Sequence, residues 1–238
     1  MRSSRSDPDP LDPGPAGFTH RGLHYGSEFP ENSLIAFAAA LEFGAGIECD
    51  LRLTADNHVV LFHDRDASRL CGSPMKIGES TLADLARLSL GGHPIPTLGS
   101  LLKMVDGRVP LLLEVKVNHD IWRWVPALRD GLAGYRGRFA VMSFDPRIPR
   151  LMKTNMPEVR RGLIVRDRHS SVRRHFAIAL GSPQFLAVER PALGKPWVER
   201  ARQRMPVYGW TIRTAEERRQ AEVQADAPIW EGDGRPRI

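Results

Sequence analysis

The chain has 238 residues, a net charge of +6 and a hydrophobic fraction of 42%, proportions that are ordinary for a globular protein. This apolar content excludes disorder over the whole length, and no apolar run approaches the ~20 residues that cross a bilayer. Two cysteines, Cys49 and Cys71, exclude a disulfide framework and a four-cysteine metal site. Because the first 17 residues lack the apolar segment of a secretory signal, we expect a cytoplasmic protein with no stable membrane insertion.

The positive charge is dispersed along the chain. Lys and Arg number 34 against 28 Asp and Glu, and the sequence pI is about 9.8. A nucleic-acid-binding protein usually gathers its basic residues on one face or stripe, whereas this chain has only short groups such as 200–204. We therefore interpret most of the charge as surface composition and expect no nucleic-acid partner, with an anionic partner or substrate as the alternative.

The first predicted segment is a tail. Residues 7–15 contain four prolines, which exclude a helix or a central strand there. We expect residues 1–16 to be a disordered or loosely packed tail and residues 17–238 to form a single domain.

Short apolar runs alternate with helical patterns along that domain. We interpret eight runs as strands: 18–19, 47–53, 111–117, 139–144, 162–165, 185–188, 207–210 and 228–230. Apolar residues at helical spacing follow potential N-caps at Ser33, Thr81 and Thr97, and later helices are predicted at 121–132, 146–155, 170–180, 196–204 and 214–224.

Strands that alternate with helices predict a parallel sheet of the α/β class. Eight repeats in this length predict a (β/α)8 TIM barrel, in which the carboxyl ends of the strands carry the chemistry. Residues 51–110 interrupt the alternation with the run 59–62 and short helices, which predicts an insertion between strands 2 and 3 over one side of the barrel mouth. A doubly wound open sheet is the alternative, but no glycine-rich phosphate loop follows the first strand.

Acidic residues lie within two of the apolar runs. Glu48 and Asp50 share one face of their strand, because side chains alternate, and Glu114 lies in the next strand of the predicted barrel. Clustered carboxylates in a core need a compensating cation. One source is Arg52, on the same face as the first pair; the other is a hard divalent ion, Mg²⁺ or Ca²⁺, which prefers oxygen ligands.

Basic and aromatic residues flank these acids. His20 and His63 each follow a strand and suit a general acid and base for displacement at phosphorus, although a structural role is the alternative for either. Arg21 and Lys116 could hold phosphate oxygens, and Gly22 would allow close approach of the backbone. Trp210 could pack against substrate or form ordinary core. We interpret the remaining histidines, among them His24, as surface residues.

The order of these motifs resembles the glycerophosphodiester phosphodiesterase family. The matching motifs are His20-Arg-Gly, Pro30-Glu-Asn-Ser33, Glu48-Cys-Asp50, Thr54-Ala-Asp56, Val59 to His63-Asp64, Ile95-Pro-Thr-Leu98 and Glu114-Val-Lys116. The resemblance covers about residues 18–211. The end of the chain departs from it, because Ile229-Trp-Glu-Gly-Asp-Gly-Arg-Pro236 replaces the family's usual Thr-Asp-x-Pro-like sequence.

The resemblance implies a phosphatidylinositol-phosphodiesterase-like TIM barrel with one bound metal ion. It implies metal ligation by Glu48, Asp50 and Glu114, catalysis by His20 and His63, and substrate binding by Arg21, Lys116 and Trp210. The expected reaction is hydrolysis of a small glycerophosphodiester to sn-glycerol 3-phosphate and an alcohol. We assign His20 as base and His63 as acid, and the residues are equally compatible with the reverse.

Two alternative hypotheses for the function are also compatible with the sequence. The same chemistry could act on lysophospholipid-type diesters, in which case apolar residues should line the mouth, and Leu82, Leu85, Leu88 and Leu90 of the insertion are the candidates. The second hypothesis is a barrel without catalytic activity that binds phosphate esters. The sequence predicts neither the oligomeric state nor the alcohol.

Overall fold

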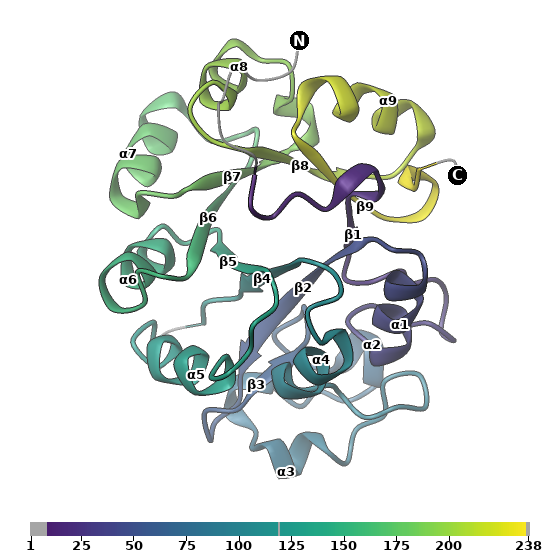
Figure 1. The fold of residues 1–238 in the computed structure, drawn as a ribbon. Helices are drawn as coiled ribbons and strands as arrows, with labels where there is room; N and C mark the ends of the chain where they lie inside the picture. Colours follow the sequence, from purple (N-terminus) through teal and green to yellow (C-terminus); the bar gives the residue numbers. More distant parts are fainter. Residues whose placement is uncertain (1–8, 119, 237–238) are drawn as a thin grey trace.

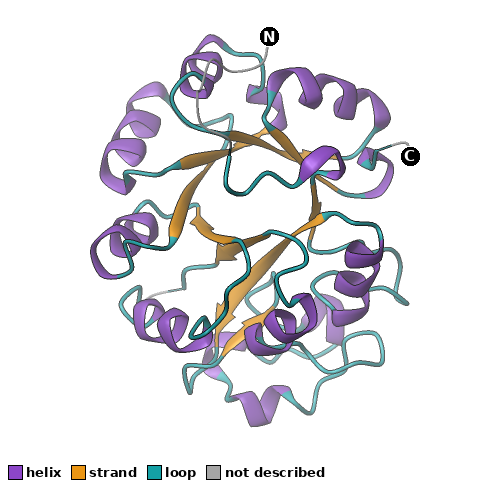
Figure 2. Cartoon of the chain, in the orientation of Figure 1, coloured by secondary structure: helices purple, strands orange, loops and turns teal. Residues whose placement is uncertain are grey.

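The computed structural model describes residues 9–118 and 120–236. Over these residues, eight parallel strands form a closed ring with the helices outside it (Figures 1 and 2). The strands are β1 Phe18–His20, β2 Gly46–Leu53, β4 Leu111–Val115, β5 Phe139–Ser143, β6 Arg160–Val165, β7 Phe185–Glu189, β8 Val207–Ile212 and β9 Ala227–Trp230. The ring closes because β1 pairs with both β2 and β9. The predicted TIM barrel is confirmed.

The helices follow the predicted alternation. They are α1 Leu34–Glu42, α4 Leu98–Val105, α5 Trp124–Gly131, α6 Arg147–Asn155, α7 Ser171–Gly181, α8 Pro196–Arg202 and α9 Ala215–Gln224, with the short α2 Ser68–Cys71 and α3 Leu82–Leu85 in the insertion. The side chains of Ser33, Thr81 and Thr97 each accept the backbone N–H three residues later, which satisfies a free donor of the first turn. The predicted caps are confirmed.

Strand β2 shows how the pleat positions polar groups inside the ring. Ile47, Cys49 and Leu51 belong to the apolar cluster between the sheet and its helices. The alternate residues Glu48 and Asp50 are 1% and 0% exposed. Burying a side chain such as Leu51 contributes about 1.5–3 kcal/mol, so a one-residue shift, which would exchange the two sets, is strongly unfavourable. The outward residues therefore hold the inward carboxylates in place.

The insertion adds β3 Val59–Leu61, which pairs antiparallel with the end of β2. It lies to one side of the ring with α2 and α3 (Figure 1). The insertion has an apolar core of its own, in which Leu85 and Leu90 are buried and Leu82 and Leu88 pack against them. These leucines stabilise the insertion.

The start of the chain closes the end of the barrel opposite the carboxyl ends of the strands (Figure 1). Leu11 is 1% exposed and packs in the apolar interior of the ring. Asp9 accepts hydrogen bonds from Tyr208 Oη at 2.5 Å and Arg160 Nη2 at 2.9 Å. The prediction of a loose tail is therefore wrong for residues 9–16, because the side chains of Leu11 and Asp9 make specific contacts with the barrel. The rest of that predicted tail lies outside the described residues.

Among the described residues, no helix combines the length and the apolar character needed to cross a membrane.

Candidate active site

Three buried carboxylates meet at the carboxyl ends of β2 and β4. Asp50 and Glu114 are paired residues in the parallel register, and Glu48 lies two residues before Asp50 on the same face. One oxygen from each lies within 4.8 Å of the others. The structure therefore brings together all three residues that the sequence suggested as metal ligands.

Asp50 is held on one edge by the loop that precedes α1. Asn32 Nδ2 donates to Asp50 Oδ2 at 2.9 Å, and the backbone N–H of Asp50 donates to Asn32 Oδ1 at 3.0 Å. Asn32 is fully buried, with φ of 57°. This two-way contact fixes the orientation of the carboxylate and leaves its Oδ1 directed elsewhere.

Arg21 connects β1 to the carboxylates. Its backbone N–H donates to Glu48 Oε2 at 3.1 Å, and its Nε lies 3.1 Å from Asp50 Oδ2. Its φ of 58° lies in the left-handed region, which directs this N–H toward the cluster. The next residue, Gly22, packs against α1, where a Cβ would lie 2.9 Å from Phe37. Gly22 thus allows close backbone approach, as expected, but to a helix.

Lys116 provides the second cation. Its Nζ lies 2.9 Å from Asp50 Oδ1 and also contacts Glu114 Oε1. Arg52, the alternative partner for the acids, is directed away from them. Its Nε and Nη2 donate to the carbonyl oxygen of His63 at 2.9 and 2.5 Å. Arg52 therefore fixes the backbone that carries His63.

The two cations leave the carboxylates undercompensated. Burial, together with the charges of Asp50 and Glu114, raises the pKa of Glu48 well above its usual value. Burial also raises the pKa of Glu114 to about 7, against the opposing charge of Lys116. Burial acts the same way on Asp50, but Lys116 and Arg21 outweigh it and hold the Asp50 pKa below its usual range. Three carboxylates against two cations leave a deficit of positive charge.

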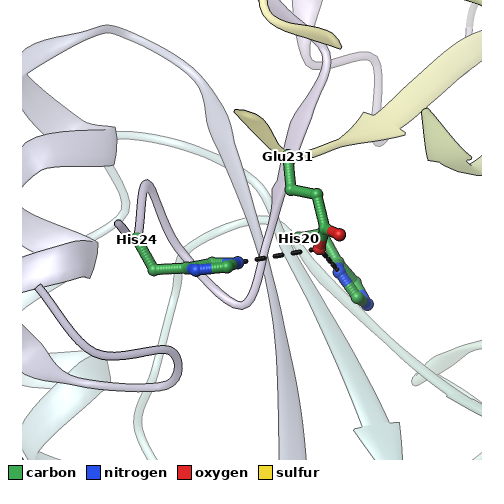
Figure 3. A group of neighbouring side chains, drawn as sticks. All are labelled: His20, His24 and Glu231. Carbon is green, nitrogen blue, oxygen red and sulfur yellow. Dashed lines mark hydrogen bonds and ion pairs between the residues drawn. The ribbon is translucent and has the colours of Figure 1, made fainter. Parts of the chain in front are cut away.

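His20 is held by a residue that the sequence reasoning did not select (Figure 3). Its Nδ1 lies 2.5 Å from Oε2 of Glu231, which follows β9. The other oxygen of Glu231 accepts a hydrogen bond from Arg213 Nε at 2.7 Å. His24 Nε2 lies 3.6 Å from Glu231 Oε2, so interpreting His24 as a simple surface residue is wrong. The carboxylate occupies Nδ1 of His20 and leaves Nε2 for the pocket.

The electrostatics of this group favour an ionised Glu231 beside a neutral imidazole. Burial lowers the pKa of His20, against the effect of the hydrogen bond that His20 donates to Glu231. Burial acts to raise the pKa of Glu231, but His20, His24 and Arg213 outweigh it and hold that pKa well below its usual range. A neutral imidazole that donates from Nδ1 carries a lone pair on Nε2, as a general base requires.

His63 has an equivalent support. Its Nδ1 lies 2.7 Å from Asp64 Oδ1, and the other oxygen of Asp64 accepts from Arg69 Nε at 2.6 Å. Arg69 also donates to both oxygens of Glu31, which accepts a hydrogen bond from Arg21. A chain of alternating charges thus joins the segments that carry the two histidines.

These groups surround a pocket of about 230 Å³. Its lining residues are His20, Arg21, Glu48, His63, Glu114, Lys116, Met142, Phe144, Ile164, Arg166, Ala187, Trp210, Thr211, Arg213 and Ile229. Trp210 lies on the wall, with Nε1 donating to the carbonyl oxygen of Ala187 at 3.0 Å. The insertion leucines proposed as an apolar mouth do not contribute to this lining, because they form the insertion's own core.

Sequence reasoning missed Glu231, Asn32 and Arg69. Glu231 lies in the segment that departs from the family pattern, and its neighbours give no sign of a partner 211 positions away. Asn32 was recognised as part of a motif and as a helix-start signal, yet its contact with Asp50 exists only in the folded chain.

Comparisons with known proteins agree with this geometry. A family model described as the Glycerophosphoryl diester phosphodiesterase family matches residues 20–229. A glycerophosphodiester phosphodiesterase from Caldanaerobacter subterraneus subsp. tengcongensis is 29% identical over 160 residues, which cover 61% of this chain and 64% of that relative. The match thus spans less than two thirds of the relative's length.

Solved structures share the fold. A glycerophosphodiester phosphodiesterase from Thermotoga maritima has a TM-score of 0.74 at 26% identity, covering 90% of this chain and 92% of that one. An Oleispira antarctica phosphodiesterase, solved with the product sn-glycerol-3-phosphate, has a TM-score of 0.81 at 22% identity, covering 91% and 92%. Since the family model matches most of the chain, this protein belongs to the glycerophosphoryl diester phosphodiesterase family.

Proposed function

We propose that this protein hydrolyses glycerophosphodiesters to sn-glycerol 3-phosphate and an alcohol. The observation that carries the proposal is that two carboxylate-supported histidines share one pocket with two members of the cluster of three buried carboxylates. The names of the relatives and the product bound to the Oleispira antarctica phosphodiesterase point to the same reaction.

The donor set fits one hard divalent ion. Glu48, Asp50 and Glu114 offer oxygen ligands within 4.8 Å of one another, and oxygen ligands are those that Mg²⁺ and Ca²⁺ prefer. The raised pKa values of Glu48 and Glu114 fit the same conclusion, because they reflect a shortage of positive charge beside these carboxylates, which a divalent ion would supply. When bound, the ion supplies electrostatic stabilisation of the phosphoryl oxygens.

The histidines perform the proton transfers. His20 accepts a proton at Nε2 from the nucleophile, which is water or the substrate's own 2-hydroxyl. Attack by the 2-hydroxyl forms a cyclic phosphate as the alcohol leaves, and a water molecule then opens this ring to give sn-glycerol 3-phosphate. His63, whose Nδ1 is held by Asp64, acts in its imidazolium form and donates the proton on Nε2 to the leaving alkoxide. Each carboxylate at Nδ1 stabilises the imidazolium form of its ring and fixes the ring's orientation.

The cations bind the phosphate. Arg21 presents a planar guanidinium and Lys116 a compact ammonium at the same side of the pocket as the carboxylates. Both are already ordered by Asp50, so little side-chain entropy is lost when substrate arrives. Trp210 packs against the organic part of the substrate on the opposite wall.

The test is hydrolysis of glycerophosphoinositol, with and without EDTA. His20→Ala, His63→Ala and Glu114→Ala should each abolish turnover while far-ultraviolet circular dichroism stays that of a folded barrel. His58→Ala, in which the replaced side chain is 55% exposed and remote from the pocket lining, is the matched control and should retain full activity. Near wild-type turnover in all three site variants would contradict the mechanism.

The lysophospholipid alternative has no support from the insertion, whose leucines are buried in its own core. The cytoplasmic location stays a prediction, as does the absence of a nucleic-acid partner.

A further inference from the structure

Arg166 lies on the wall of the pocket opposite His20. It directly follows β6, and β6 is four strands from β1 in either direction around the ring. The pocket at the carboxyl ends of the strands is lined by both His20 and Arg166 and therefore reaches from β1 to β6. A diester whose phosphorus lies at the carboxylates therefore extends one of its two ends toward β6.

The charge of Arg166 has no acidic partner among the described residues. Its guanidinium instead lies over an aromatic ring, 4.6 Å from the centroid of Phe144. The other cations of the pocket are paired: Arg21 and Lys116 with Asp50, and Arg213 with Glu231. Arg166 is thus a half-buried residue of the pocket lining whose guanidinium has no carboxylate partner among the described residues.

The aromatic residues of this wall exclude the obvious cationic ligand. Phe144 and Trp210 form an edge-to-face pair with centroids 5.5 Å apart, an arrangement that resembles half of a cage for a quaternary ammonium. However, Lys116 Nζ lies 5.8 Å from the same Phe144 centroid, so two protein cations already occupy the ring. A choline or ethanolamine group would be repelled there, whereas an anion would be attracted.

We propose that Arg166, with Phe144 and Trp210, forms a subsite for a second anionic group on the alcohol part of the substrate. The preferred substrates are then glycerophosphodiesters whose alcohol carries a phosphate or a carboxylate. A guanidinium binds either group through two parallel N–H donors. This inference rests on the proposed phosphodiesterase function and names the class of alcohol.

The test compares two substrates that differ by one phosphate, glycerophosphoinositol and glycerophosphoinositol 4-phosphate. We expect kcat/KM of the wild-type protein to be at least tenfold higher for the phosphorylated substrate. Arg166→Gln should abolish that preference by lowering kcat/KM at least tenfold more for the phosphorylated than for the unphosphorylated substrate, and Arg166→Lys should retain part of the preference. Arg168→Gln, in an exposed side chain of the same loop, is the matched control and should retain all of it.

The outcomes separate this inference from the function on which it rests. Hydrolysis of neither substrate by the wild-type protein contradicts the proposed function. Hydrolysis of both with equal kcat/KM, or a preference that survives in Arg166→Gln, overturns the subsite and keeps the function. A preference for glycerophosphocholine over both inositol substrates would also overturn it, since that result requires a wall that attracts cations.

Discussion

Replacing Glu231 by Gln tests whether this carboxylate positions His20. The substitution keeps the size of the side chain and a hydrogen-bond acceptor but removes the negative charge 2.5 Å from His20 Nδ1. A hydrogen bond to a charged group contributes about 1.5–3 kcal/mol, roughly twice a neutral one. The charge matters most when His20 becomes an imidazolium during proton transfer, so the loss should fall on the transition state.

We therefore expect kcat of Glu231→Gln to fall by about 10- to 100-fold, since each 1.4 kcal/mol corresponds to a factor of ten, while KM stays within threefold. The Arg213 partner is 58% exposed, so loss of that ion pair should cost at most about 1 kcal/mol of stability. Steady-state kinetics with glycerophosphoinositol and thermal unfolding measure the two effects separately.

Two companion variants sharpen the result. Glu231→Asp keeps the charge on a shorter side chain and should recover part of kcat. Glu216→Gln removes an acid that is 61% exposed on α9 and should leave kcat unchanged. Unchanged kcat in Glu231→Gln, or a loss confined to KM, would refute the positioning role.

Three further predictions follow from the site and the barrel. Since the folded-state pKa of Glu114 is raised to about 7 from 4.5, the metal-free protein should lose up to about 3 kcal/mol of stability as pH rises from 4.5 through 7. Glu114→Gln or saturating Ca²⁺ should flatten this dependence in thermal unfolding, and stability that rises over this interval would contradict it. Asn32→Ala, which frees one edge of Asp50, should weaken Mg²⁺ or Ca²⁺ binding by about 10- to 100-fold in calorimetric titration, and unchanged affinity would contradict the orienting role. Leu11→Ala should lower the free energy of unfolding by about 2–4 kcal/mol in urea without changing kcat, whereas a loss below about 0.5 kcal/mol would show that the start of the chain does not close the barrel.

Local rules account for the elements that could be predicted. Serine and threonine caps mark helix starts because their oxygens satisfy free N–H groups one turn away, which is information contained in four consecutive residues. The shared face of Glu48 and Asp50 in β2 is also local information, because side chains alternate along a strand with a period of two. The order of the strands then placed Glu114 beside them.

The prediction of a loose tail was wrong because amino-acid composition does not show which contacts a segment makes in the folded protein. Four prolines exclude a helix or a central strand in residues 7–15, but they do not exclude an extended segment that packs. Leu11 and Asp9 are ordered by the far end of the barrel, through the apolar interior and through Tyr208. No local pattern contains that contact.

The composition of the chain shows an excess of positive charge but does not indicate a role for it. The sequence by itself determined the strand and helix alternation, the shared face of Glu48 and Asp50, and the family motifs, because each depends on residues a few positions apart. Only the tertiary structure decided that Glu231 reaches His20 and that Arg52 holds His63 instead of the acids. It also placed Arg166 in the pocket lining with no acidic partner in the part of the chain that the structure describes. Closure of the ring brings the carboxyl ends of distant strands to one mouth, so these partners depend on contacts between residues far apart in the chain.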